Sequence, residues 1–256
     1  LVLSLVGSEM CIRDRRYRVL TFDCYGTLID WEAGIWDAFQ PLISASGRSD
    51  VQRKEVLEAF ARFENRLESE APGIPYPEVL TGVHRAVAEH FQLQTSPVLD
   101  SDFGQSVPNW PAFPDTADAL RFLKKRNLLV ILSNVDRERF AASRRKLGVD
   151  VDAVYTAEDI GSYKPAPANF EYLLEHLRSD LELEKDEVLH TAQSLFHDHR
   201  PAMSFGLATA WIDRQRLSQS GQWGATARLD EIPKTDFVFH SMAEMAAAVA
   251  DGESSG

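Results

Sequence analysis

The sequence has few cysteines, no long hydrophobic run and fewer basic than acidic residues. Two cysteines among 256 residues, Cys11 and Cys24, cannot build a disulfide framework, so we expect the reducing cytoplasm. No apolar run approaches the roughly 20 residues that a membrane helix needs. Lys and Arg number 27 against 39 Asp and Glu, a net charge of −12. This acidity argues against nucleic acid or an anionic membrane as a partner.

The two ends of the chain differ in composition from the rest. Residues 1–15 read LVLSLVGSEMCIRDR, and their order of apolar and charged residues is not that of a secretory signal. Glu9–Arg15 matches the translation of a sequencing-library adaptor, so we interpret 1–15 as a non-native leader. The alternative is a disordered native leader. The last residues, 251–256, read DGESSG and are expected to form a flexible tail.

Short β-branched runs alternate with helical patterns through most of the chain. Asp115 and Asp136 are suited to begin two of the helices, and Gly148 to end the second. This alternation predicts an α/β fold with a doubly wound, Rossmann-like parallel sheet and helices on both faces. The predicted strands are 18–22, 128–132, 188–192, 207–212 and 237–239.

One long segment breaks this alternation. Residues 31–112 carry three apolar stripes at helical spacing, with no strand pattern between them. Asp30 is suited to cap the first helix, and Ser49 or Asp50 the second. We therefore predict a core made of residues 16–30 and 113–250, with a helical domain inserted at 31–112.

Polar residues follow the first two long strands. Asp23 comes directly after 18–22, and Gly26 lets backbone amides approach, which suits a carboxylate nucleophile. Ser133 and Asn134 end the next strand and could donate hydrogen bonds to an oxyanion or a substrate carboxylate. Both patterns are also common in ordinary turns. Because ligands bind beyond the carboxyl ends of parallel strands, we expect these residues to share one site.

Two later residues complete the candidate site. Lys164 precedes Pro165, which favours extended backbone and lets the long side chain reach inward. An ammonium group close to Asp23 would keep that carboxylate ionised. Asp198 lies between a strand and a helix and is either a helix cap or a second catalytic carboxylate. Cys24 is expected to point away from Asp23 and to be buried.

The order of these motifs resembles the haloacid dehalogenase superfamily. The match comprises Asp-x-Tyr-Gly-Thr-Leu at 23–28, Ser-Asn at 133–134, Lys-Pro at 164–165 and the late Asp198. Tyr25 and the long helical insert are similar to the type II, L-2-haloacid dehalogenase group. The resemblance implies an insert that acts as a cap, and an enzyme that cleaves the carbon–halogen bond of short 2-haloacids. A homodimer that needs no cofactor is also implied.

The resemblance also implies roles for individual residues. Asp23 would attack the halogen-bearing carbon and form an ester, which water then hydrolyses with help from Lys164 and Asp198. The predicted substrate-binding residues are Tyr25, Thr27, Ser133, Asn134, Gln193 and, from the cap, Arg62, with Arg53, Arg66 and Arg85 as rivals to Arg62.

Some positions depart from the dehalogenase pattern. Gln193 and Leu195 stand where a Ser and an Asn are expected, and Phe170 stands where a Tyr is expected. Two alternatives therefore stay open. One is a phosphatase of small metabolites that holds Mg²⁺ through Asp23 and Asp198; the other is a catalytically silent binding protein. Tyr25 argues against the phosphatase, because its phenol is a poor acid or base at neutral pH.

His197 and His199 flank Asp198 in the sequence. Their spacing at a helix start sends the two rings apart, which argues against a shared metal ion. We instead expect one of them to act as a base that activates water, because imidazole titrates near neutral pH.

Overall fold

The computed structural model describes residues 17–222, 224, 227 and 229–250, so the predicted leader and tail lie outside the described residues. Six parallel strands form one sheet in the order β3-β2-β1-β4-β5-β6. The strands are β1 (Val19–Phe22), β2 (Leu128–Ser133), β3 (Ala153–Thr156), β4 (Val188–Ala192), β5 (Ala208–Ile212) and β6 (Phe237–Phe239). The order reverses at β1, so the predicted doubly wound α/β fold is confirmed.

The five predicted strands are present, but β3 was not predicted from the sequence. This strand is four residues long, lies at the edge of the sheet and pairs with β2 alone. Its first two residues are only partly buried, so it lacks the continuous apolar run that marks the central strands.

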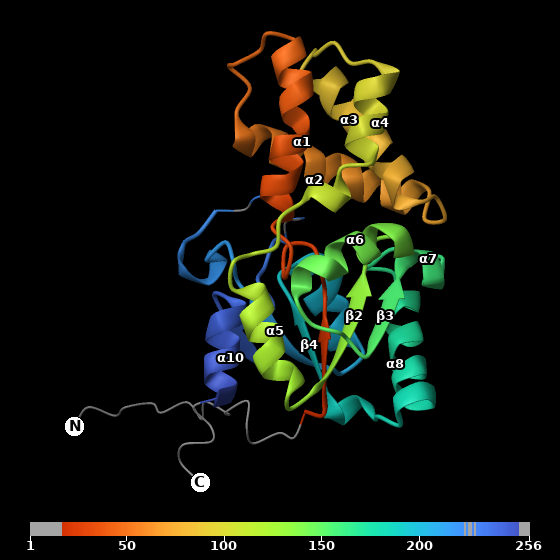
Figure 1. Cartoon of the computed structure of the whole chain (residues 1–256), viewed down its shortest axis with the longest axis vertical. Coiled ribbons are helices and arrows are strands. Elements are labelled where there is room, and N and C mark those ends of the chain that lie inside the picture. The colour runs from red at the N-terminus through yellow and green to blue at the C-terminus, as the bar shows by residue number, and fades with distance from the viewer. Residues whose placement is uncertain (1–16, 223, 225–226, 228, 251–256) are drawn as a thin grey trace, which may run out of the picture.

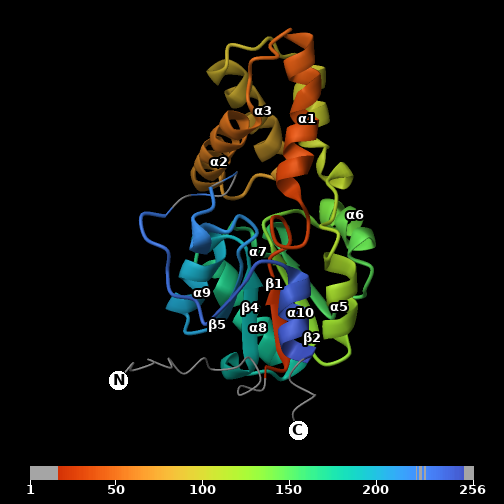
Figure 2. The same cartoon turned by 90° about the vertical axis from the view of Figure 1, so that its left-hand side faces the viewer.

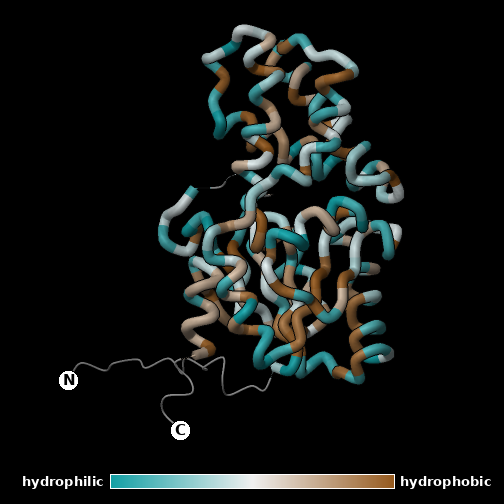
Figure 3. The backbone as a smooth tube through the Cα atoms, in the orientation of Figure 1, coloured by the Kyte–Doolittle hydropathy of each residue, from teal (hydrophilic) through white to brown (hydrophobic). Residues whose placement is uncertain are grey.

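Helices cover both faces of the sheet (Figures 1 and 2). Along β1, Leu20 and Phe22 pack into one apolar cluster and Val19 into another, as expected for side chains that alternate across a sheet. Hydrophobic residues accordingly concentrate in the strands (Figure 3). The helices α5 (Thr116–Lys124), α6 (Arg137–Leu147) and α10 (Met242–Ala250) cover the first face, and α8 (Ala168–Leu181) and α9 (Arg200–Ser204) the second. In the described part of the chain, we find no helix with the length and apolar character needed to cross a membrane.

Four helices lie beyond the carboxyl ends of the strands (Figure 1). They belong to the segment predicted as an insert, and we call them the helical insert. Asp30 caps the first, accepting a hydrogen bond from the Ala33 amide at 3.1 Å. The second begins after Gln52, so neither Ser49 nor Asp50 caps it; Asp50 instead pairs with Arg48. The helices are α1 (Trp31–Ala45), α2 (Arg53–Glu70), α3 (Tyr76–His90) and α4 (Pro97–Gly104).

Of the three residues predicted to begin or end core helices, Asp136 and Gly148 have the predicted role and Asp115 does not. Asp136 caps α6 through a 3.0 Å bond from the Arg139 amide, and Gly148 ends that helix with φ of 69°. Asp115 precedes α5 but makes no capping bond with its side chain. Its carboxylate instead accepts two 3.0 Å hydrogen bonds from Arg214.

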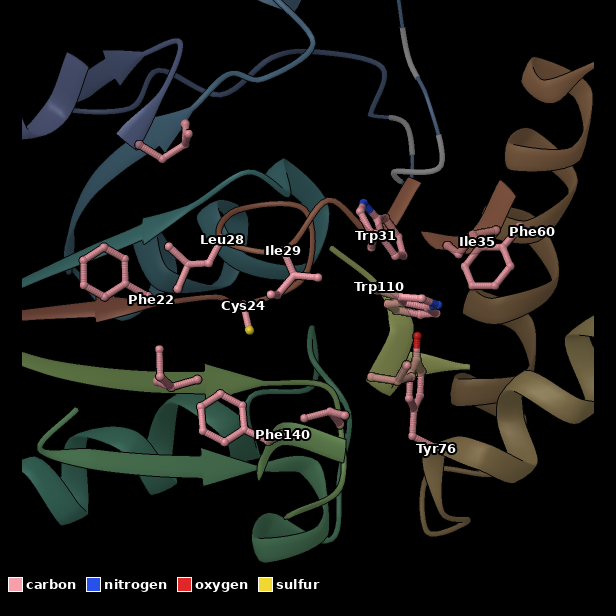
Figure 4. Packing of buried hydrophobic residues seen from close by; sticks show 14 of the residues in the cluster. Phe22, Cys24, Leu28, Ile29, Trp31, Ile35, Phe60, Tyr76, Trp110 and Phe140 are labelled. Carbon is pink, nitrogen blue, oxygen red and sulfur yellow. The ribbon is translucent and has the colours of Figure 1, made fainter. Parts of the chain in front are cut away.

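Buried apolar residues continue from the core into the helical insert (Figure 4). Trp110, which is fully buried, packs so closely on Gly34 that a Cβ atom there would lie 2.3 Å from the indole. Trp31 packs edge to face on Phe60 of α2. The aromatic side chains thereby hold α1 and α2 directly above the first strand.

Candidate active site

The folded chain brings three of the predicted residues into direct contact. Asp23 follows β1, Lys164 lies in the loop after α7 (Ala157–Ile160), and Asp198 lies in a π-helical turn, Leu195–His199, after β4. Because β1 and β4 are adjacent parallel strands, their carboxyl ends open at the same edge of the sheet.

Lys164 links the two carboxylates. Its Nζ atom lies 2.9 Å from Asp23 Oδ1 and 2.6 Å from Asp198 Oδ1, and it donates a third hydrogen bond to the Leu132 carbonyl at 3.0 Å. The side chain is 1% exposed. Burial alone would lower the pKa of Lys164, but the two carboxylates outweigh burial and raise it. Lys164 is therefore a fixed cation at neutral pH.

The second oxygen of Asp23 is also held. Thr27 Oγ1 donates to Asp23 Oδ2 at 2.8 Å and accepts a hydrogen bond from the Gln193 amide at 2.9 Å. Burial, with a further contribution from Asp198, raises the pKa of Asp23 above its usual value, and Lys164 and Thr27 oppose this rise without cancelling it. Gly26 has φ of +95°, and a Cβ atom there would lie 3.0 Å from both the Gln193 and Trp31 side chains. This glycine permits the tight turn that aims the carboxylate.

A histidine to which the sequence assigned no role supports Asp198. His190 Nε2 lies 3.0 Å from Asp198 Oδ1, and its Nδ1 lies 2.8 Å from Thr21 Oγ1. Burial would raise the pKa of Asp198, but Lys164 and His190 outweigh burial and hold it well below the usual range. Among the described residues, Asp198 Oδ2 is buried without a hydrogen-bond partner. It is thus an acceptor that the described protein atoms leave unused.

Asn134 holds the lysine loop in place. Its Oδ1 accepts from the Lys164 amide at 2.7 Å, and its Nδ2 donates to the Lys164 carbonyl at 3.0 Å. Both ends of this side chain therefore bind backbone. Ser133 is buried at the end of β2, and within the described part of the chain its hydroxyl has no partner.

Tyr25 and Gln193, two of the predicted substrate-binding residues, line a cavity beside Asp23. The Tyr25 hydroxyl bonds to Ser143 Oγ at 2.9 Å, and burial raises the pKa of this phenol well above its usual value. Leu195 and Phe170 are buried, and Phe170 packs edge to face on His190. Cys24 is fully buried, as predicted.

The cavity has a volume of about 40 Å³ and lies between core and helical insert. The insert contributes three polar residues that were not predicted from the sequence: Glu64, Glu68 and Tyr76. The Tyr76 hydroxyl donates to Glu64 Oε1 at 2.7 Å, and Asn134 Nδ2 lies 3.4 Å from Glu68 Oε2. The lining residues are Asp23, Tyr25, Trp31, Glu64, Glu68, Tyr76, Asn134, Lys164, Gln193, Ser194, His197 and Asp198.

The candidate cap arginines lie elsewhere. Arg62 and Arg66 are exposed, and both guanidinium groups pack over the Phe63 ring. Arg85 pairs with Asp100 at 2.8 Å, and Arg53 is exposed at the start of α2. No arginine among the described residues lines the cavity.

The two histidines beside Asp198 form hydrogen bonds with different parts of the protein. His197 Nε2 lies 2.6 Å from Asn65 Oδ1 in α2, whereas His199 Nε2 donates to the Ala192 carbonyl at 2.8 Å. Burial lowers the pKa of each to about 4. Both are therefore neutral at pH 7 and are weaker bases than an ordinary histidine.

The contacts of Asp23, Lys164 and Asp198 form a buried polar centre at the strand ends, and comparisons with known proteins identify the family. The family model for haloacid dehalogenase-like hydrolases matches residues 17–191. Over 211 residues the chain is 27% identical to (S)-2-haloacid dehalogenase 4A of Burkholderia cepacia, covering 77% of this chain and 84% of that protein. The chain therefore belongs to the haloacid dehalogenase-like hydrolase family.

Solved structures share the same fold. The L-2-haloacid dehalogenase of Xanthobacter autotrophicus superposes with a TM-score of 0.73 at 19% identity, covering 91% of this chain and 98% of that one. The HAD hydrolase YfnB of Bacillus subtilis, bound to magnesium, also gives 0.73 at 18% identity, covering 92% and 100%.

Proposed function

We propose that this protein hydrolyses the carbon–halogen bond of short 2-haloacids through an ester on Asp23. The observation that carries the proposal is the hydrogen bonding of Asp23, whose two oxygens are held by Lys164 and Thr27 beside the cavity between core and helical insert. A carboxylate so oriented is prepared to attack carbon. The likeness to (S)-2-haloacid dehalogenase 4A supports the same reaction.

In the first step an oxygen of Asp23 donates an electron pair to the carbon that bears the halogen. The carbon–halogen bond breaks, and the halide leaves with the bonding electrons. Lys164 favours the ionised form of the nucleophile, because its ammonium group lies 2.9 Å away. The helical insert acts as a cap and excludes water during this step.

In the second step water attacks the carboxyl carbon of the ester and releases the 2-hydroxy acid. Asp23 regains its carboxylate, and one proton is released overall. Asp198 orients the water through Oδ2, since its other oxygen is occupied by Lys164 and His190. His190 and Thr21 fix the direction of Asp198 and are positioning residues.

A magnesium ion held by Asp23 and Asp198 would compete with Lys164, whose ammonium group already lies 2.9 Å and 2.6 Å from their Oδ1 atoms. Within the described ranges, no three His, Cys, Asp or Glu side chains are grouped so that they could hold a metal. Gln193 contributes an amide, a weaker ligand for a hard cation than a carboxylate. We therefore expect turnover in the presence of EDTA.

The test is halide release from L-2-chloropropionate by the purified protein in EDTA. We expect chloride from the wild type and none from Asp23→Asn, whose neutral amide cannot attack. Absence of chloride from every short 2-haloacid would refute the proposal. Turnover of p-nitrophenyl phosphate that EDTA abolishes would identify the phosphatase instead.

We also infer a cytoplasmic homodimer with a core of residues 16–30 and 113–250 and a cap of residues 31–112. The low cysteine content supports the compartment. The separation of the helical insert from the sheet supports the division (Figure 2).

A further inference from the structure

A second cavity lies within the helical insert. It has a volume of about 280 Å³, roughly that of nine water molecules in the liquid, so it has room for a small organic molecule. Helices α1, α3 and α4, which lie together above the sheet in Figure 1, and the turn after α4 form its walls. Among the described residues, none borders both this cavity and the catalytic cavity.

The wall of this second cavity contains a buried histidine that is held in one orientation. His84 of α3 is 1% exposed, and its Nδ1 atom lies 2.8 Å from Asp100 Oδ1. Asp100 also accepts hydrogen bonds from Thr95 Oγ1 at 2.7 Å and from Arg85 Nε at 2.8 Å. Asp100 is therefore a carboxylate, which can only accept, and the proton of the neutral His84 imidazole lies on Nδ1.

The other ring nitrogen, Nε2, is the polar atom that His84 offers to the cavity. Within the described part of the chain Nε2 takes part in no hydrogen bond, and Phe39 and Phe103 pack on the ring. Burial lowers the pKa of His84, and Asp100 opposes this effect without cancelling it. At neutral pH, Nε2 therefore carries a lone pair and can accept a hydrogen bond from a bound molecule.

The outer part of the cavity is acidic. Asp37 of α1 and Asp102 of α4 are exposed and border it, and within the described ranges neither carboxylate has a hydrogen-bond or ion-pair partner. No lysine or arginine in the described part of the chain borders the cavity. The lining therefore offers acceptors and negative charge, which favour a cation that carries hydrogen-bond donors.

The lining fits an organic cation better than a metal ion. The histidine and the two aspartates are not grouped closely enough to hold a metal, since no three His, Cys, Asp or Glu side chains in the described ranges are. Leu99, Phe103 and Trp110 give the cavity apolar and aromatic surface. The indole N–H of Trp110 is already donated to Ser106 Oγ at 3.2 Å. Aromatic faces attract organic cations and also pack on apolar groups.

We propose that this cavity binds a small organic amine in its protonated form, at a site separate from the active site. The ammonium group of the amine lies beside Asp37 and Asp102, and an O–H or N–H group elsewhere in the molecule donates to His84 Nε2. The apolar body of the amine lies against the aromatic lining. Because none of these residues takes part in the proposed reaction, the inference does not rest on the proposed function.

The test is a calorimetric titration of the full chain at pH 7 with tyramine, which combines an ammonium group, an aromatic ring and a phenolic hydroxyl. We expect one molecule per chain, with a dissociation constant of about 1 mM or lower. The phenol 4-ethylphenol lacks the charge and 3-(4-hydroxyphenyl)propionate reverses it, so both should bind at least about tenfold more weakly. Absence of saturable tyramine binding, or equal binding of the anion, would overturn the inference.

The double variant Asp37→Asn/Asp102→Asn removes both charges at exposed positions and leaves the hydrogen bonds around His84 in place. Tyramine should bind to it roughly tenfold more weakly, because two exposed ion pairs are lost. The matched control, Glu78→Gln/Glu89→Gln, removes the same charge from exposed positions of α3 that do not border the cavity. It should bind tyramine like the wild type. Equal weakening in both double variants would show that net charge alone attracts the amine and would overturn the inference.

The variant His84→Asn tests the hydrogen bond to Nε2. The amide of the new side chain can still donate to Asp100, whereas the acceptor Nε2 is lost. Tyramine should bind to this variant roughly fivefold more weakly, while phenethylamine, which has no hydroxyl, should bind as it does to the wild type. An unchanged affinity for tyramine would overturn the inference. If His84→Asn does not fold, the aspartate variants decide the question.

A catalytic variant separates the two cavities. Asp23→Asn alters the catalytic cavity alone, so it should bind tyramine as the wild type does. Loss of tyramine binding in Asp23→Asn would place the amine in the catalytic cavity and overturn the inference, whatever the outcome of the chloride assay.

Discussion

The ammonium group of Lys164 lies 2.6 Å from Asp198 Oδ1, closer than the 2.9 Å that separate it from Asp23 Oδ1. Asp198 therefore shares its cation with Asp23, and its remaining oxygen, among the described residues, is buried without a partner. In the proposed reaction, two roles are divided between these carboxylates. There, Asp23 forms the covalent bond, while Asp198, whose pKa is held well below its usual value, keeps its charge and orients water.

This division predicts that Asp198→Asn slows the second step more than the first. Asp23 retains Lys164 and Thr27 in this variant, so the halide should leave once per enzyme. Hydrolysis of the ester should fall by about 10²-fold, the loss typical when a reacting group such as the attacking water is misplaced. Mass spectrometry after rapid denaturation should then find the acyl group on the peptide that contains Asp23.

Asp150→Asn is the control, because Asp150 is an exposed carboxylate paired with Arg144 at the surface. It should turn over like the wild type. Steady wild-type turnover by Asp198→Asn would contradict the role given to Asp198.

The tight turn after β1 gives a second prediction. In Gly26→Ala, a positive φ of +95° and a Cβ atom 3.0 Å from the Gln193 and Trp31 side chains both oppose folding. We expect a loss of about 2–4 kcal/mol in the free energy of unfolding, from backbone strain together with overpacking. Urea denaturation measures this loss.

Gly161→Ala is the matched control, since Gly161 has φ of +74° but no atom within 4 Å of the place where a Cβ would lie. It should lose only the backbone part, about 1 kcal/mol. Equal losses of unfolding free energy in the two variants would show that the contacts with Gln193 and Trp31 do not contribute to the destabilisation of Gly26→Ala.

The residues at the strand ends could be predicted from sequence, and those of the insert could not. Asp23 and Asp198 follow strands with clear apolar runs, and parallel strands bring such positions to one edge of the sheet. Glu64 and Glu68 reach the cavity only through the way α2 packs above that edge. This packing depends on contacts distant in sequence, such as Trp31 against Phe60.

His190 and Asn134 show two other limits of prediction from the sequence. The parallel register of β1 and β4 pairs Thr21 with His190, which places the imidazole between Thr21 and Asp198. A sequence pattern does not reveal this register, although the alternation along β4 could have shown that His190 shares a face with Ala192. Asn134 was found at the site, but its amide binds the Lys164 backbone, a role that depends on the loop conformation.

The last prediction concerns stability in acid. His199 is fully buried, and burial, with a further contribution from His190, lowers its pKa from 6.5 to about 4. Between pH 6.5 and about pH 4, His199 of the unfolded chain binds a proton, whereas His199 of the folded protein does not. The contribution of His199 to the free energy of unfolding therefore decreases as the pH falls from 6.5 to about 4, by about 3 kcal/mol in total.

The variant His199→Gln isolates this contribution. Its amide can still donate to the Ala192 carbonyl, as His199 Nε2 does at 2.8 Å, but it does not titrate. Glu64 and Glu68 titrate in both proteins and cancel in the comparison. The difference in unfolding free energy, wild type minus variant, should thus become smaller or more negative from pH 7 to pH 4. Urea denaturation at each pH measures it, and a constant difference would mean that His199 is not the group that destabilises the fold in acid.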